Sequence, residues 1–442
     1  MAYGMFAGGN GTAATPYLIE DAADLDAIRK NLTANYKLIN NINLGVPPYN
    51  IGSGWLPINN FLGRFNGNGK KIINLFINRS DIDSVGLFGV ISLPVAWTDP
   101  IIYDVALEDV NVTGKQNVGG LVGTVAWTIN TNYIPPANIL TRVYVTGKII
   151  GQSRLGGIVG LAYFPGGIGN VYWGADWNNF IIDAISMCEI NCVAPDTASE
   201  RIMGGIVGYG AATYHYNYNI GNYVYNYAGG VANSISLCTF ITTDANQIAR
   251  SHIGMHPSNP VAPASFNTNC FYDSTLFGGN LANAGVTAVT TANLKAFSLY
   301  STFKDLITPY GKTLYRFREG HYPTFWFTNQ ECYFVRAGKD YLTYDADQKK
   351  WMKQFDVLQD TPTILSLGMP TLYHIDTQGW NQLRAAYGQV DIVNFVEPTE
   401  RLSLNSIAAI LPLTAQNDES MLCYKKEINF ESFNDDIISI VP

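Results

Sequence analysis

Charged residues are scarce in this chain, and their scarcity limits its partners. Only 14% of the 442 residues are Asp, Glu, Lys or Arg, whereas about a quarter are charged in a typical soluble domain. The 27 basic and 35 acidic residues give a net charge of −8, and no run of Lys or Arg occurs. Because nucleic-acid binders carry a basic patch or stripe, we expect no nucleic-acid partner.

Segments that would insert into a membrane are also lacking. The sequence contains no stretch of 18 apolar residues, which a transmembrane helix would need. Residues 1–9 have neither a basic region nor an apolar core, so they do not resemble a signal peptide. We therefore expect no membrane insertion and a chain that folds in the cytosol. Disulfides are rare in that compartment, so we expect the six cysteines to be buried thiols: Cys188, Cys192, Cys238, Cys270, Cys332 and Cys423.

Motifs for metal or nucleophilic chemistry are few. His252 and His256 have the spacing of zinc ligands on a helix, but the intervening Gly254 and the following Pro257 favour a loop. No nucleophile motif such as Gly-x-Ser-x-Gly occurs. We expect no metal and no cofactor, and the sequence identifies no catalytic residue.

Glycine, in contrast, is abundant and recurs in a short motif. Asn-Val-Gly-Gly-Leu-Val-Gly at 117–123 returns as Leu-Gly-Gly-Ile-Val-Gly at 155–160 and Met-Gly-Gly-Ile-Val-Gly at 203–208, with a looser copy at 85–89. Recurrence at irregular steps indicates a repeat architecture with insertions. Each Gly would cost about 1 kcal/mol inside a helix, so we expect short strands ending where a missing Cβ permits positive φ or close stacking. The repeat glycines are Gly86, Gly89, Gly119, Gly120, Gly123, Gly156, Gly157, Gly160, Gly204, Gly205 and Gly208.

Alternating apolar residues precede two of these motifs, at 104–114 and 142–147, and predict short strands that stack into parallel sheets. Together with Phe-Asn-Gly-Asn-Gly at 65–69, the glycine motifs resemble the GLUG-motif family of right-handed parallel β-helix proteins. The segments at 269–273, 290–294 and 319–323 are similar to the closing section of such arrays. The resemblance extends roughly over residues 10–326. It implies a mainly β protein built as a right-handed parallel β-helix, or solenoid.

We expect three parts. Residues 1–45 form an N-terminal cap, residues 46–330 the GLUG-type β-helix, and residues 331–442 a separate C-terminal α+β or β module for attachment or recognition. Within the cap, a helix is predicted over 20–32, because Leu25, Ile28 and Leu32 share one face and Asp21 or Asp24 can cap its start.

In the C-terminal module, residues 333–345 predict a β-hairpin with its turn at 337–340. Residues 377–387 predict a short helix that ends before Gly388.

A tyrosine-rich insertion is the candidate binding site. Aromatic faces stack on sugar rings, and Tyr and Asn side chains match sugar hydroxyls, so we predict that these residues bind a glycan. The alternative is that they pack on neighbouring loops or on a partner subunit. The candidates follow the third glycine motif or lie in an earlier insertion: Tyr214, Tyr216, Tyr218, Tyr223, Tyr225, Trp173 and Trp177.

The resemblance allows several functions, because the family includes adhesins, peptidase-attached stalks and phage tail proteins. We expect a structural virion protein of a phage tail (fibre, spike or baseplate component), assembled in the host cytoplasm. Its expected partners are other virion tail proteins, a host cell-surface glycan for adsorption, and copies of itself in a homotrimer. The C-terminal module loosely resembles those of tail proteins from phages of Gram-positive bacteria.

Two alternatives remain open. The first is an adhesin on the bacterial cell surface. The second is a tailspike polysaccharide depolymerase, since two acids about 5–10 Å apart can cleave a glycan. The acid pairs would be Glu108 with Asp109, or Asp176 with Asp183. Solvated loop acids are the simpler interpretation of both pairs, so enzymatic activity is the less favoured expectation.

Overall fold

The structure is a computed structural model, and the chain divides into two compact units, residues 1–290 and 291–442. The sequence places the start of the C-terminal module later, at residue 331. Only the backbone is described within 212–217, 222–227 and the strands after residue 333. The described residues are 6–93, 100–127, 139–163, 180–193, 201–210, 212–217, 222–227, 230–242, 247–254, 267–280, 282–296, 299–303, 305–306, 314–316, 322–325, 334–337, 340–345, 350–353, 375–376, 390–393, 420–421 and 438–440.

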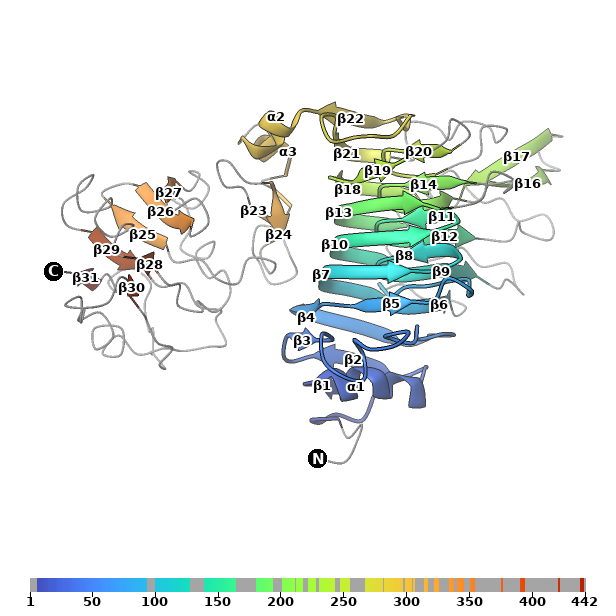
Figure 1. The fold of residues 1–442 in the computed structure, drawn as a ribbon, viewed down its shortest axis with the longest axis horizontal. Coiled ribbons are helices and arrows are strands. Elements are labelled where there is room, and N and C mark those ends of the chain that lie inside the picture. The colour runs from blue at the N-terminus through green and yellow to red at the C-terminus, as the bar shows by residue number, and fades with distance from the viewer. Residues whose placement is uncertain are drawn as a thin grey trace. The chain divides into compact units, whose positions relative to one another are not determined.

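The first unit is a parallel β-helix in which a complete coil places one strand in each of three sheets (Figure 1). One such coil consists of β10 (Leu140–Gly151), β11 (Ser153–Gly156) and β12 (Val159–Tyr163). Each of these strands pairs in parallel with its equivalents in the coils before and after it. The expectation of a mainly β, parallel β-helix is therefore confirmed.

The longest sheet, called the long sheet, runs in the order β1-β2-β4-β7-β10-β13-β18-β21-β22, with β3, β5 and β19 paired alongside. The other two are the β6–β15 sheet (β6, β9, β12, β15) and the β8–β20 sheet (β8, β11, β14, β20). The strands not yet given are β1 (Tyr17–Ile19), β2 (Asn35–Leu38), β3 (Ile42–Asn43), β4 (Arg64–Ile73), β5 (Phe76–Asn78), β6 (Phe88–Leu93), β7 (Ile102–Thr113), β8 (Gln116–Gly119), β9 (Val122–Trp127), β13 (Ile181–Cys192), β14 (Ile202–Gly204), β15 (Val207–Gly210), β18 (Val231–Ser236), β19 (Thr239–Ile241), β20 (Ile248–Arg250), β21 (Asn267–Asp273) and β22 (Val286–Val289).

The glycine motifs form the corner between the β8–β20 sheet and the β6–β15 sheet, and they stack in register. Gly156 pairs with Gly119 on one side and Gly204 on the other. None of the repeat glycines has a positive φ, so close packing, the second of the two expected reasons, explains them. A Cβ on Gly157 would lie 1.9 Å from Ser186 Oγ, and one on Gly120 would lie 2.5 Å from Val145 Cγ1. The missing side chains thus leave room for residues of the long sheet.

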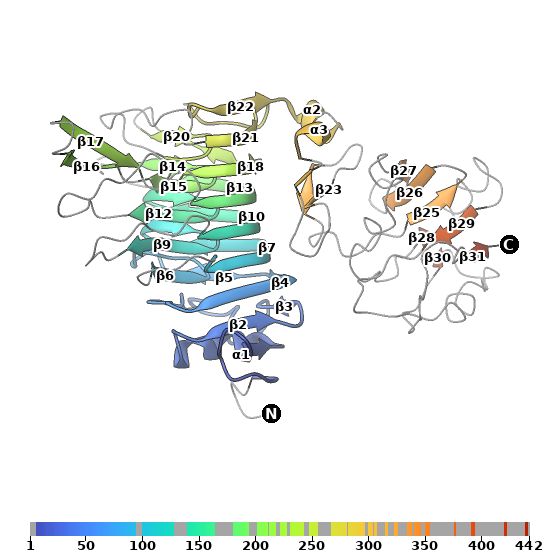
Figure 2. The same cartoon turned by 180° about the vertical axis from the view of Figure 1, so that it is seen from behind.

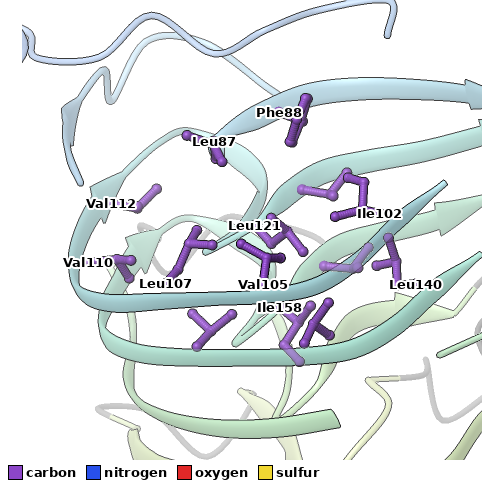
Figure 3. Close-up of a cluster of buried hydrophobic side chains, with 14 of the residues drawn as sticks. Leu87, Phe88, Ile102, Val105, Leu107, Val110, Val112, Leu121, Leu140 and Ile158 are labelled. Carbon is purple, nitrogen blue, oxygen red and sulfur yellow. The ribbon is translucent and has the colours of Figure 1, made fainter. Parts of the chain in front are cut away.

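The interior between the sheets is filled by stacked aliphatic side chains, shown in Figure 3. Leu121, Ile158 and Ile206 are fully buried and follow one another in consecutive coils. Their backbones are hydrogen-bonded, from Leu121 N to Ile158 O at 3.1 Å and from Ile158 N to Ile206 O at 3.0 Å. Val105 and Leu107 of β7 belong to the same buried core. Each such side chain contributes about 1.5–3 kcal/mol through its burial, which makes the core the main source of stability.

The predicted capping helix is present but shorter than expected. Helix α1 spans Ala22–Ala27 and continues into the 3₁₀ helix η1 (Ile28–Lys30), whereas the sequence predicts a helix over 20–32. Asp21 is the N-cap, and its side chain accepts a hydrogen bond from Asp24 N at 2.9 Å. Leu25 and Ile28 are fully buried, so this apolar face covers the first coils.

Two asparagine side chains cap the last edge of the β8–β20 sheet, at β20. Asn283 Oδ1 accepts hydrogen bonds from His252 N (2.8 Å) and Ile253 N (2.9 Å), and its Nδ2 donates to Ile253 O (2.9 Å). Asn280 Oδ1 accepts from Ala249 N at 3.0 Å, and its Nδ2 donates to Gln247 O at 2.6 Å. These amides take the place of the backbone that a further coil would provide, and they satisfy an otherwise open strand edge.

The segment at 65–69 differs from its prediction. Its Gly and Asn residues indicate turns, but it lies inside β4. The pairing of β4 with β7 shifts register between Asn66 and Lys70, and Asn68 has a φ of 51°. The strand predicted over 72–77 is interrupted at Asn74, whose φ is 60°. Left-handed residues therefore kink these strands without ending the sheet.

The second unit contains the predicted hairpin. Strands β25 (Phe334–Ala337) and β26 (Asp340–Asp345) are antiparallel, and Ala337 pairs with Asp340 at the expected turn. The helix predicted over 377–387 lies outside the described residues. The antiparallel sheet runs in the order β27-β26-β25-β29-β31. The remaining elements are α2 (Thr291–Lys295), α3 (Tyr300–Phe303), β23 (Tyr315–Arg316), β24 (Thr324–Phe325), β27 (Lys350–Lys353), β28 (Ile375–Asp376), β29 (Val390–Val393), β30 (Ser420–Met421) and β31 (Ile438–Ile440).

The packing at the glycine motif predicts that Gly157→Val destabilises the β-helix by about 3 kcal/mol. The new side chain would overlap Ser186 Oγ and the Gly205 carbonyl oxygen, which a Cβ would approach to 2.5 Å. Chemical denaturation followed by circular dichroism measures the loss. Gly52→Ala is the control, because nothing lies within 4 Å of its added Cβ; its φ of 62° limits the cost to about 1–2 kcal/mol. Equal losses in the two variants would contradict the packing role.

Candidate functional site

Four of the predicted binding residues lie on one two-stranded ribbon. Among the described strands, β16 (Ala212–Asn217) and β17 (Asn222–Tyr227) pair only with each other, in antiparallel orientation. Figures 1 and 2 show this pair, which we call the tyrosine ribbon, projecting beyond the edge of the β-helix. Tyr214 pairs with Tyr225, and Tyr216 with Tyr223. Because directly opposed residues share a face of a sheet, and alternate residues of a strand do so too, all four occupy the same face.

The ribbon lies at a corner where insertions recur. It connects β15 of the β6–β15 sheet to β18 of the long sheet. One coil earlier, residues 164–179 make the same connection, from β12 to β13, and they contain Trp173 and Trp177. The two connections start side by side, since Ala162 pairs with Gly210. Trp173, Trp177 and Tyr218 themselves lie outside the described residues.

A column of polar residues, which the sequence analysis missed, runs along the long sheet. The backbone φ of each member is between 48° and 57°. The residue before each member pairs with its equivalent in the next coil: Tyr103 with Thr141, Thr141 with Ile182, Ile182 with Ala232, and Ala232 with Thr268. Asn and Asp tolerate this left-handed conformation better than most residues. An alignment of the strand beginnings would have revealed the column, which consists of Asp104, Arg142, Asp183, Asn233 and Asn269.

The column is held together by hydrogen bonds between coils. Arg142 forms an ion pair with the buried Asp104, with 3.2 Å between Nη2 and Oδ2. Asn233 Nδ2 donates to Asp183 Oδ1, and Asn269 Nδ2 donates to Asn233 Oδ1, each at 3.2 Å. Burial raises the pKa of the Asp183 carboxyl to about 6, against the hydrogen bond from Asn233, which lowers it. Burial also raises the pKa of Asp104, although Arg142 acts in the opposite direction.

Of the four acids considered for glycan cleavage, three lie in the described part of the chain, and each has different surroundings. Glu108 forms an ion pair with Lys71, with 3.0 Å between Oε2 and Nζ. Asp109 is exposed and lies at a kink with a φ of 57°. Asp183 belongs to the polar column, and Asp176 is outside the described residues. Among the described residues, no group of three or more His, Cys, Asp or Glu side chains is arranged to hold a metal ion.

The interior of the last coil contains an unusual histidine. His252 follows Ile206 in the aliphatic column, since Ile206 N donates to His252 O at 2.9 Å. Its side chain is fully buried, and neither ring nitrogen has a hydrogen-bond partner of regular geometry among the described residues. Burial lowers the pKa of His252 to about 4, although the nearby backbone of Ser234 and Ser251 acts in the opposite direction. The predicted loop character of residues 252–256 fits Ile253 and Gly254, which lie outside the regular strands; His256 is not described.

The described cysteines are interior residues. Cys188 and Cys238 are both buried, and Cys188 N donates to Cys238 Sγ at 3.4 Å. Cys192 and Cys270 are buried as well, and none of these four forms a disulfide. The expectation of buried thiols is confirmed for them. In the described residues, no helix is both long and apolar enough to span a bilayer.

Comparisons with known proteins find local similarity in sequence. No family model matches the chain. It is 48% identical over 93 residues to a protein of Evansella cellulosilytica described as a Gly-rich membrane protein, a match of 20% of this chain and 11% of that protein. It is 36% identical over 159 residues to halomucin of Haloquadratum walsbyi, a match of 35% of this chain and 2% of halomucin. The matched regions are thus small fractions of both relatives.

Among solved structures, the chain is similar to a protein of Bacteroides ovatus described as an immunoglobulin A1 protease. The identity is 18% and the TM-score is 0.46, with 73% of this chain and 95% of that chain covered. The assignment of a parallel β-helix to the present chain comes from its own strand pairing.

The polar column predicts that Asp183→Asn stabilises the protein above pH 6. The folded-state pKa of about 6 exceeds the usual 3.8, so the folded state binds the proton more tightly and Asp183 costs stability as pH rises from 3.8 to 6. An asparagine carries no buried charge and suits the left-handed position, as Asn233 does. We expect a gain of roughly 1–2 kcal/mol at pH 7 that disappears near pH 4, measured by denaturation at both pH values. A gain that does not depend on pH would contradict this origin.

The buried His252 predicts that the protein loses stability as pH falls, whereas Asp183 lowers stability as pH rises. The folded-state pKa of His252, about 4, lies below the usual 6.5, so the unfolded chain binds more protons and stability falls as pH drops from 6.5 to 4. His252→Ile extends the aliphatic column and removes this term. The free-energy difference between variant and wild type should grow by up to about 3 kcal/mol over that range. A constant difference across the range would show that His252 is protonated equally in both states.

Proposed function

We propose that the chain is a structural protein of a phage tail, as a fibre, spike or baseplate component, that binds a host cell-surface glycan during adsorption. The observation that carries this proposal is the continuous β-helix, in which the long sheet links the coils from β1 to β22 through parallel pairing. Such a stack is rigid, because every coil is hydrogen-bonded to its neighbours. Rigidity suits a protein that holds a binding surface away from a particle.

The resemblance of the repeated Gly-Gly-Leu-Val-Gly and Gly-Gly-Ile-Val-Gly segments to the GLUG motif supports this proposal, because that family includes phage tail proteins. The tyrosine ribbon supplies the surface for the glycan at one edge of the β-helix. In this proposal the protein is assembled in the host cytoplasm and resides in the virion tail. Its partners are other tail proteins and two further copies of itself in a homotrimer.

A second candidate is an adhesin on the bacterial cell surface. The local similarity to a protein described as a Gly-rich membrane protein favours it, since that description points to a membrane rather than to a virion. Both candidates use the same physical properties, a rigid stack that presents a binding surface. They differ in the object to which the chain is attached.

The location of the protein distinguishes the two candidates. Antibodies raised against the purified chain should label the tail of phage particles released from the source culture, as observed by immunogold electron microscopy. The purified chain should also compete with these particles for adsorption to host cells. Label confined to the bacterial envelope, with none on particles, would contradict the virion proposal and favour the adhesin. Preimmune antibodies provide the control.

A further inference from the structure

The sequence of the tyrosine ribbon is unusual in its lack of charge. Its twelve residues include five tyrosines and three asparagines but no Asp, Glu, Lys or Arg. The uncharged stretch is far longer than the ribbon and extends from Ile202 to Thr243. The chain as a whole carries a net charge of −8. A ligand at the ribbon therefore meets no charged side chain of the ribbon itself.

The strand register separates the ribbon into two unlike faces. Tyr227 pairs with Ala212, which lies two positions before Tyr214, so a fifth tyrosine joins the face identified above. The tyrosine face thus holds Tyr214, Tyr216, Tyr223, Tyr225 and Tyr227. The opposite face holds the pairs Thr213 with Asn226, His215 with Val224 and Asn217 with Asn222.

The tyrosine positions form a regular grid. Opposed residues on the two strands are about 4.5–5.5 Å apart, and alternate residues along one strand are about 6.8 Å apart. The grid has two rows that run along the ribbon, which favours an extended ligand over a compact one. The ribbon pairs with no other strand in the described chain, and both views show it standing clear of the sheets (Figures 1 and 2).

From this juxtaposition we infer that the tyrosine face of the ribbon binds an uncharged, linear polysaccharide. Aromatic rings offer an apolar face to the C–H face of a sugar and a hydroxyl group to its O–H groups. Uronic acid or phosphate groups would call for Arg, Lys or another charged donor, and the ribbon has none. A protein partner would gain little orientation here, because complementary charges fix register at protein interfaces. The inference rests on the proposed function, since it specifies the glycan that the protein adsorbs to.

The test measures binding of the full chain to soluble polysaccharides by affinity electrophoresis and calorimetry. The probes are neutral linear polymers (a glucan, a galactan and a mannan) and two anionic ones (polygalacturonate and a teichoic acid). The chain should bind at least one neutral polymer and neither anionic one. Binding to the anionic polymers alone, or to no polymer in the panel, would overturn the inference.

Matched double variants locate the site on one face of the ribbon. Tyr214→Ala with Tyr225→Ala changes an opposed pair on the tyrosine face, and His215→Ala with Val224→Ala changes the adjacent opposed pair on the other face. We expect the tyrosine variant to bind about tenfold or more weakly, and the control variant to bind within about twofold of wild type. Thermal unfolding should match in all three proteins, because the ribbon pairs with no described strand of the coils.

Equal binding by both variants would overturn the inference. So would loss of oligomerisation in the tyrosine variant by light scattering, because the face would then be a contact between copies of the chain. If the antibodies label phage tails and the tyrosine variant still binds the glycan as wild type does, the virion location holds and the binding site on the ribbon is wrong. Conversely, absence of the chain from particles would defeat the proposed function while leaving the polysaccharide measurement valid.

Discussion

The β-helix depends on one steric constraint, the absence of a side chain at the second glycine of each Gly-Gly pair. A Cβ at Gly120, Gly157 or Gly205 would lie 1.9–2.5 Å from a side-chain atom of the long sheet, on Val145, Ser186 or Ser236. Those long-sheet side chains occupy the space that the glycines leave. The sheets can therefore approach closely, and the aliphatic column beside the glycines is close-packed. Because the same contact recurs in successive coils, the coils share one register.

A second constraint shapes the outside of the coils. Left-handed residues bend the long-sheet strands at equivalent places, and their polar side chains hydrogen-bond from coil to coil. The column contains both a buried ion pair, Arg142 with Asp104, and an acid with a raised pKa, Asp183. Titratable groups with shifted pKa values often mark active sites, but structural networks shift them as well. Here the geometry of stacked kinks accounts for both groups.

The fold can be predicted from the sequence because it consists of repeated coils, and each coil repeats the same short motifs. The glycine motifs, the alternating strands and Asp21 as a helix cap each correspond to a described element. Prediction fails where one residue type serves two purposes: Asn68 and Gly69 indicate a turn, yet they kink a continuing strand. The polar column could not be predicted from a residue pattern, because its members differ in residue type. Arg142 and Asp183, for example, share only a left-handed backbone conformation. For the candidate site, the sequence identifies the tyrosines, but the face they share depends on strand register. That register is set by the length of the connection between β16 and β17, which the sequence pattern does not determine.

The amides of Asn280 and Asn283 have a consequence for how such molecules change over evolution. A stack of parallel coils contains no internal signal to stop, because each coil presents the same row of backbone donors and acceptors to the next. Here two side chains supply that signal for the β8–β20 sheet. Duplication or loss of one coil would alter the length of the array by one strand spacing, about 4.8 Å, and leave its terminator intact. The length of the β-helix can therefore change during evolution in steps of one coil, while the residues that cap it stay the same.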